Sequence, residues 1–157
     1  MGCHAEKNKK INLCHFFEDK NYAEITINSI ISINENKSSI KFFNKNKECV
    51  AKIHIDGGLI KSSEKKKADY MVINCDKKIS YIIELKGCDL VKACSQILST
   101  YNEIERYING SVVNARIILT RVISPSLNSS EQKKLQKLCK DKGGTLLIKS
   151  VLFEEDI

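Results

Sequence analysis

The stretch IIELKG, residues 82–87, places two charges of opposite sign in an otherwise apolar run. If the run is a strand, Glu84 and Lys86 point to one face and Leu85 to the other, because successive side chains alternate. Burying these charges is costly unless an ion pair, or a metal together with a substrate phosphate, offsets the lost hydration. A carboxylate with a nearby lysine is suited to Mg²⁺-dependent hydrolysis of a phosphodiester.

A second carboxylate, Asp69, begins the preceding strand-like segment. A turn over residues 75–78 would pair the two segments as an antiparallel hairpin and bring Asp69 opposite Glu84. We therefore expect both carboxylates to hold Mg²⁺, with the backbone carbonyl of Leu85 as a further oxygen ligand. Lys86 would position or deprotonate the attacking water, or stabilise the charge that develops on the phosphoryl group. The structural alternative is an ion pair between Glu84 and Lys86 at a sheet edge, with Asp69 in a turn.

The hydrophobic pattern predicts the elements that would position these residues. The expected order from Cys49 onward is strand, strand, strand, helix, strand, helix and strand, over 49–60, 68–74, 79–87, 89–108, 115–122, 129–144 and 145–153. Strands connected through helices predict a mixed central β-sheet flanked by helices, an α/β fold. We expect a single domain over residues 1–157, in which residues 1–48 form an N-terminal extension with a short helix and strands. A Rossmann-type sheet is disfavoured, because no GxGxxG motif follows a strand.

Asp69, Glu84 and Lys86, in this order and on these elements, resemble the PD-(D/E)xK signature of restriction endonucleases, Holliday-junction resolvases and RecB-type exonucleases. The resemblance covers residues 49–153, since the element order also matches the core of that superfamily. It implies a restriction-endonuclease-like αβββαβ core. It also implies a Mg²⁺-dependent nuclease, with Mn²⁺ as a substitute, that cuts DNA in preference to RNA and acts as an endonuclease rather than an exonuclease.

The resemblance extends in part to the helix after the ExK strand. Gln96 matches a glutamine that these nucleases often carry there, which implies a place for it in the catalytic site. Tyr101 stands one position later than the QxxxY spacing of the RecB-like branch requires. Ala68 replaces the proline of the family motif, a common variation. An acidic residue on a helix before the core has no clear match, and Glu18 and Glu24 are the candidates.

The charge balance favours an anionic partner, because 26 lysines and arginines face 19 acidic residues and give a net charge of +7. A lysine-rich, solvated surface is the alternative explanation. The candidate phosphate contacts are Lys66 and Lys67 in the loop before Asp69, Lys92 on the predicted helix, and Arg121 after the next strand. A core this small has little room to read bases, so we also expect a homodimer or a partner subunit.

No segment approaches the ~18 consecutive apolar residues that would cross a bilayer. The N-terminus lacks the apolar core of a signal peptide, so we expect a cytoplasmic protein without a membrane partner. Seven cysteines without a CxxC pair then predict reduced thiols rather than disulfides. The pairs Cys3–His4 and Cys14–His15 do not match the ligand spacing of zinc fingers.

Two non-enzymatic interpretations stay open beside the nuclease. The same fold could serve a nucleic-acid-binding or assembly protein without catalysis, because superfamily members can lose activity and keep the scaffold. The carboxylates and the lysine could also form an ion-pair network with no role in nucleic-acid binding. The presence of Asp69, Glu84 and Lys86 together favours catalysis. Substrate form, sequence preference and biological role do not follow from the sequence.

Overall fold

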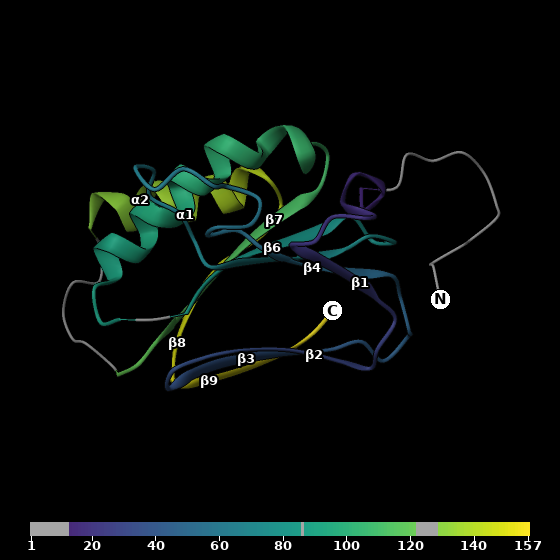
Figure 1. Ribbon diagram of the computed structural model, residues 1–157. Coiled ribbons are helices and arrows are strands. Elements are labelled where there is room, and N and C mark those ends of the chain that lie inside the picture. Colours follow the sequence, from purple (N-terminus) through teal and green to yellow (C-terminus); the bar gives the residue numbers. More distant parts are fainter. Residues whose placement is uncertain (1–12, 86, 122–128) are drawn as a thin grey trace.

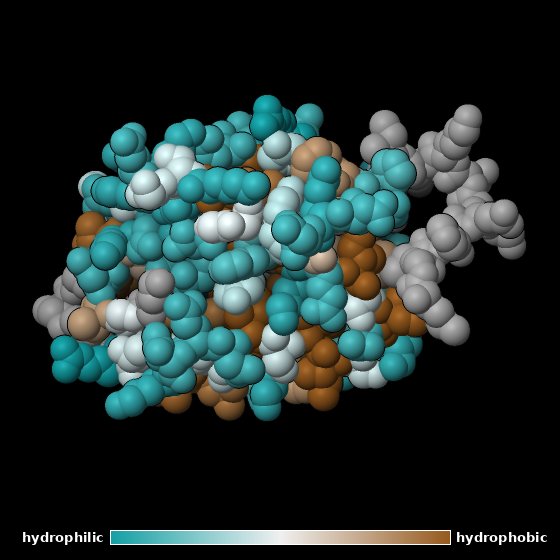
Figure 2. Space-filling model, viewed as in Figure 1, coloured by the Kyte–Doolittle hydropathy of each residue, from teal (hydrophilic) through white to brown (hydrophobic). Residues whose placement is uncertain are grey.

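Two β-sheets lie face to face, and two α-helices cover the outer face of the larger sheet (Figure 1). This computed structural model describes residues 13–85, 87–121 and 129–157. The order of layers is therefore helices, six-stranded sheet and three-stranded sheet. In the space-filling view, hydrophilic side chains dominate the helical layer, and apolar patches lie at the level of the sheets (Figure 2).

The larger sheet has the strand order β1-β4-β5-β6-β7-β8. Its strands are β1 (Ala23–Thr26), β4 (Val50–His54), β5 (Tyr70–Asn74), β6 (Ile79–Leu85), β7 (Val112–Leu119) and β8 (Leu146–Ser150). Neighbours from β1 to β6 are antiparallel, whereas β6, β7 and β8 run parallel and are connected through α1 (Leu90–Ile104) and α2 (Ser130–Asp141). These elements confirm the predicted mixed α/β architecture.

Strand β6 is apolar on both faces because it is covered on both faces. Ile82 packs into the core beneath the helices, while Ile83 and Leu85 pack into the core between the two sheets. Helix α1 begins where the sequence predicted, because the Asp89 carboxylate accepts a hydrogen bond from the Lys92 N–H at 2.9 Å. The helix ends at Ile104, and a 3₁₀ turn, η2 (Glu105–Tyr107), follows it.

The smaller sheet consists of β2 (Ile30–Glu35), β3 (Ser38–Phe43) and β9 (Leu152–Asp156) in the order β2-β3-β9. The prediction of one strand over 145–153 was wrong, because the chain leaves β8 and enters β9 at Val151. Val151 has a φ of 64°, which is unusual for a β-branched residue. Its N–H donates to the Leu119 carbonyl and its own carbonyl accepts from Ser39, both at 2.8 Å. One residue thus contacts both sheets.

The expectation of reduced thiols is wrong for one pair of cysteines. Cys14 and Cys75 form a disulfide, with their Cα atoms 5.6 Å apart. The bond attaches the segment of the 3₁₀ turn η1 (His15–Phe17) to the end of β5. Cys94 and Cys139 are buried free thiols, and burial raises the pKa of each to about 11. None of the described helices is long and apolar enough to cross a membrane.

Candidate active site

Asp69 lies directly before β5 and Glu84 lies near the end of β6, just beyond the last residue pair of the two strands. Tyr70 is paired with Ile83, so the next positions outward on the two strands are Asp69 and Glu84. The Asp69 N–H donates to the Ile83 carbonyl at 3.1 Å, and the Leu85 N–H donates to Asp69 Oδ2 at 2.8 Å. The predicted register is confirmed from the pair Tyr70–Ile83 to the pair Asn74–Ile79. Both acidic residues are buried, with 4% and 1% of their surfaces exposed.

Both carboxylates belong to the face of the sheet that α1 and α2 cover. Met71 and Ile73 on β5 pack into the core beneath the helices. Asp69 precedes Met71 by two residues, so its side chain points to the same face of the sheet. Ile82 on β6 packs into the same core, and Glu84, two residues later, points to the same face of the sheet. Two like charges are therefore adjacent on one face of the sheet, at its edge.

The backbone before Asp69 is held against α1 by two side chains of that helix. Gln96 Nε2 donates to the Lys67 carbonyl at 2.8 Å. One turn further along, Thr100 Oγ1 accepts from the Ala68 N–H at 2.7 Å. Gln96, predicted as a catalytic-site residue, thus contacts the backbone that precedes Asp69. Thr100 was missed by sequence reasoning, although its i+4 spacing from Gln96 places both on one helical face.

The carboxylate pair fits a magnesium ion by the chemistry of its donors. Mg²⁺ takes hard oxygen ligands, keeps several waters, and is held in enzymes by one or two carboxylates together with substrate phosphates. Asp69 and Glu84 supply two such groups from neighbouring strands. No group of three or more His, Cys, Asp or Glu within the described part of the chain is arranged to hold a metal.

The remaining predicted residues separate into three groups. Lys66, Lys92 and Arg121 are exposed, as phosphate contacts must be. Lys67 has only 10% of its side chain exposed, because its ammonium lies 2.9 Å from Asp56 Oδ1. Lys86 lies outside the described residues, so its predicted role stays a prediction.

Leu85 and Arg121 lie at the same edge of the sheet as the carboxylates. Leu85 ends β6, and Arg121 follows β7, the parallel neighbour of β6. Leu85 contacts Asp69 through its backbone N–H, and its carbonyl stays a predicted metal ligand. The Arg121 guanidinium lies 3.8 Å from Cys88 Sγ, beside the connection between β6 and α1. Arg121 is thus placed beside the carboxylate edge.

Three further candidates lie away from the carboxylates. Glu18 is exposed and contacts His15 at 3.4 Å, beside the N-terminal 3₁₀ turn. Glu24 pairs with Lys52 and lines a cleft between β1 and β2, on the face of the sheet opposite to Asp69. Tyr101 is buried in the helical core and donates to Glu105 at 3.0 Å. These placements favour packing or surface roles for all three.

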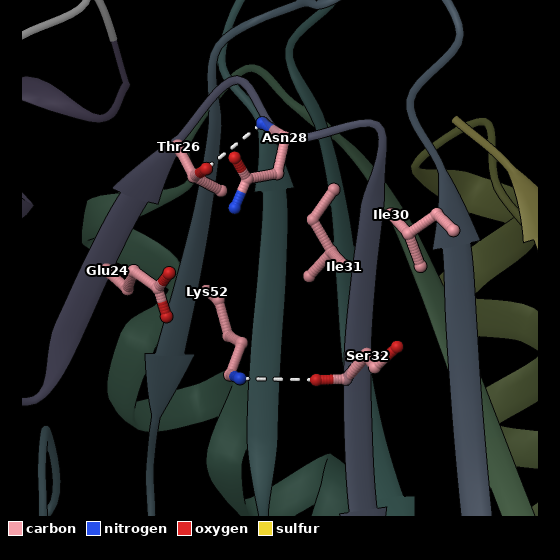
Figure 3. Close-up of a pocket in the computed structure, with 7 residues that line it drawn as sticks. All are labelled: Glu24, Thr26, Asn28, Ile30, Ile31, Ser32 and Lys52. Carbon is pink, nitrogen blue, oxygen red and sulfur yellow. Dashed lines mark hydrogen bonds between the residues drawn. The ribbon is translucent and has the colours of Figure 1, made fainter. Parts of the chain in front are cut away.

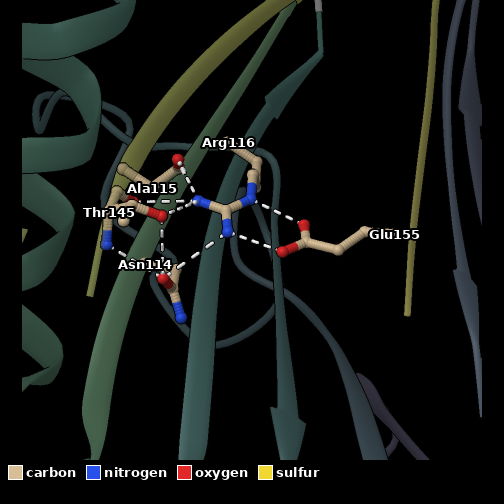
Figure 4. Close-up of polar contacts among 5 residues, drawn as sticks. All are labelled: Asn114, Ala115, Arg116, Thr145 and Glu155. Atoms are coloured by element: carbon tan, nitrogen blue, oxygen red, sulfur yellow. Dashed lines mark hydrogen bonds and ion pairs between the residues drawn. The ribbon is translucent and has the colours of Figure 1, made fainter. Parts of the chain in front are cut away.

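A second buried charged cluster connects the two sheets (Figure 4). Arg116 on β7 binds Glu155 on β9 in a bidentate pair, with both N–O distances 2.7 Å. Its third guanidinium nitrogen donates to the carbonyls of Ala115 and Thr145 at 3.0 and 2.9 Å. The guanidinium carbon also lies 5.3 Å from the centre of the Tyr81 ring. Arg116 is buried and each of its guanidinium nitrogens donates to a protein oxygen, so we assign the cluster a structural role.

Comparison with known proteins found no matching family model, no similar curated protein and no similar solved structure. Functional conclusions therefore depend on the residues and on their geometry.

Proposed function

We propose that this protein is a Mg²⁺-dependent nuclease with a restriction-endonuclease-like core, and that Asp69 and Glu84 form its active site. The observation that carries the proposal is that these two buried carboxylates lie next to the last strand pair, Tyr70–Ile83, at the same end of β5 and β6. The element order β4-β5-β6-α1-β7 supports it, because the resemblance to the PD-(D/E)xK superfamily requires that order.

Each residue of the site has a defined task in this proposal. Asp69 and Glu84 would hold Mg²⁺, which when bound supplies polarisation of the phosphodiester and a lower pKa for bound water. The Leu85 N–H fixes the orientation of the Asp69 carboxylate. Gln96 and Thr100 fix the backbone that leads into Asp69. Lys86, two residues after Glu84 in the sequence, would position the attacking water or stabilise charge on the phosphoryl group.

The exposed cations near this edge support nucleic acid as the substrate. Lys66 and Lys92 lie on the loop before β5 and on the first turn of α1, and Arg121 lies at the end of β7. Phosphate contacts of this kind supply affinity without reading sequence. We propose DNA as the preferred substrate and cleavage at internal bonds. The same cations also suit the second candidate function, a nucleic-acid-binding protein that does not cut.

Cleavage of DNA and RNA substrates with Mg²⁺ or Mn²⁺ tests the proposal. Wild type should cut in a metal-dependent manner, and Asp69→Asn and Lys86→Ala should each lower the rate by about a hundredfold or more. Glu154→Gln and Lys140→Ala are matched controls, because both residues are exposed and lie on β9 and α2. Metal-dependent cutting that persists in Asp69→Asn would contradict the proposal. Salt-sensitive binding without any cutting would favour the binding protein.

A further inference from the structure

The two faces of the sheet carry different chemistry at the carboxylate edge. Asp69 belongs to the helix-covered face, whereas the next residue, Tyr70, points to the opposite face. Tyr70 is paired with His54 on β4, and the two rings stack with centroids 4.9 Å apart and planes 26° from parallel. His54 is exposed and Tyr70 is half-buried. An aromatic platform thus lies directly behind the carboxylates.

A small cleft lies between β1 and β2, on the same face of the larger sheet as the two rings (Figure 3). It encloses about 90 Å³. It is lined by Glu24, Thr26, Asn28, Ile30, Ile31, Ser32 and Lys52. Lys52 lines the cleft and precedes His54 by two residues on β4, so the side chains of both residues point to the same face of the sheet. We call the cleft and the two rings together the inter-sheet groove.

The polar groups of the inter-sheet groove offer both donors and acceptors of hydrogen bonds. Lys52 Nζ donates to the Ser32 carbonyl at 3.2 Å, and its side chain is half-buried. The side chains of Asn28 and Glu24 point into the space between β1 and β2 (Figure 3). The Tyr70 hydroxyl is able both to donate and to accept a hydrogen bond.

We infer that the inter-sheet groove binds an unpaired nucleobase of a strand whose backbone passes the carboxylate edge. This inference rests on the proposed nuclease function and specifies its substrate as nucleic acid with a single-stranded segment. An unpaired base has an aromatic face for the rings of His54 and Tyr70, and its exposed edge has donors and acceptors for the polar lining. A base inside a duplex has both its faces and its pairing edge occupied.

Binding of an oligonucleotide that carries 2-aminopurine in a single-stranded overhang tests the groove. The base loses fluorescence when it stacks, and the protein has no tryptophan whose emission would interfere. In EDTA, to prevent cleavage, wild type should bind the overhang and quench the probe. His54→Ala should weaken this binding about tenfold and remove most of the quenching. Lys52→Met should weaken it severalfold, and blunt duplex affinity should change less than twofold in both variants.

The control variant is His15→Ala, which removes another exposed imidazole, beside η1 and away from the groove. Circular dichroism and thermal unfolding establish that each variant is folded. Equal affinity and quenching in wild type, His54→Ala and Lys52→Met would contradict base binding by the inter-sheet groove. The proposal of metal-dependent cleavage would be unaffected by that result. Quenching that depends on His54, without cutting in Mg²⁺, would support base binding by the inter-sheet groove and contradict the proposed nuclease activity. Absence of any binding or cutting by wild type would overturn both.

Discussion

Within residues 13–85, 87–121 and 129–157, two clusters of buried charged side chains are built differently. Arg116 and Glu155 carry opposite charges and lie between the sheets, where each guanidinium nitrogen donates to an acceptor of the protein. Asp69 and Glu84 carry like charges and lie where two strands meet the edge of the sheet. Like charges at close range repel, and a bound cation lowers that cost. The first arrangement suits a structural role, and the second suits a site that binds an ion.

The largest change in stability should come from breaking the Arg116–Glu155 pair. Arg116→Met should lower the free energy of unfolding by about 3–5 kcal/mol, because Glu155 keeps a charge that has lost its partner. Urea denaturation measures this loss. The double variant Arg116→Met/Glu155→Leu is the matched control, because it removes both charges and should recover much of the stability. A single variant as stable as wild type would remove the contrast between the two clusters.

Reduction of the Cys14–Cys75 disulfide should cost less than the loss of Arg116, and it should leave the carboxylates in place. The cysteines are 61 residues apart in sequence, and the loop-entropy model gives at most about 4 kcal/mol, with smaller values common in practice. Unfolding measured with and without reductant gives the difference. The variant Cys88→Ser should respond to reductant as wild type does. We expect cleavage per folded molecule to be unaffected, since Cys75 lies at the opposite end of β5 from Asp69.

Mg²⁺ should stabilise the protein through the carboxylates alone. At one hundred times its dissociation constant, a ligand of the folded state adds about 2.7 kcal/mol to the free energy of unfolding. This gain should vanish in Asp69→Asn and persist in Glu154→Gln. Without Mg²⁺, Asp69→Asn should be about as stable as wild type, because asparagine keeps a side-chain oxygen that can accept from the Leu85 N–H. Thermal unfolding with and without Mg²⁺ distinguishes these outcomes, and an equal gain in both variants would place the ion elsewhere.

The smallest effect concerns the support of Asp69 by helix α1. Thr100→Val leaves the buried Ala68 N–H without its acceptor and should cost about 1–2 kcal/mol of stability. If the backbone before Asp69 shifts, the cleavage rate should fall more than the affinity for nucleic acid. Ser95→Ala on the same helix, which removes only an exposed contact with Lys66, should leave the rate unchanged. A rate unchanged by Thr100→Val would mean that α1 does not position the carboxylate.

The sequence was sufficient where one local rule decides the structure. The turn between β5 and β6 fixes the register, so the strand ends that carry Asp69 and Glu84 were placed side by side from chain positions alone. The cap of α1 at Asp89 follows from the same kind of local rule.

Local rules fail where the chain passes from one sheet to the other. The strand pattern continues through Val151 without showing which sheet each half joins. The pairing of Arg116 with Glu155 spans 39 positions and exists because the two sheets lie face to face, with β3 against β7 and β9 paired with β3. Neither the disulfide of Cys14 nor the stack of His54 on Tyr70 has a signal in the spacing of the residues. These contacts depend on how distant segments meet.

The most direct test compares Glu84→Gln with Glu155→Gln, measuring cleavage and unfolding on the same samples. The two substitutions are chemically identical and remove one carboxylate charge from each cluster. The account predicts that Glu84→Gln loses metal-dependent cleavage by about a hundredfold or more and keeps its stability. Glu155→Gln should lose about 1–3 kcal/mol of stability and cleave normally while folded. Normal cleavage by Glu84→Gln would contradict the account, since the carboxylate pair would then have no part in catalysis.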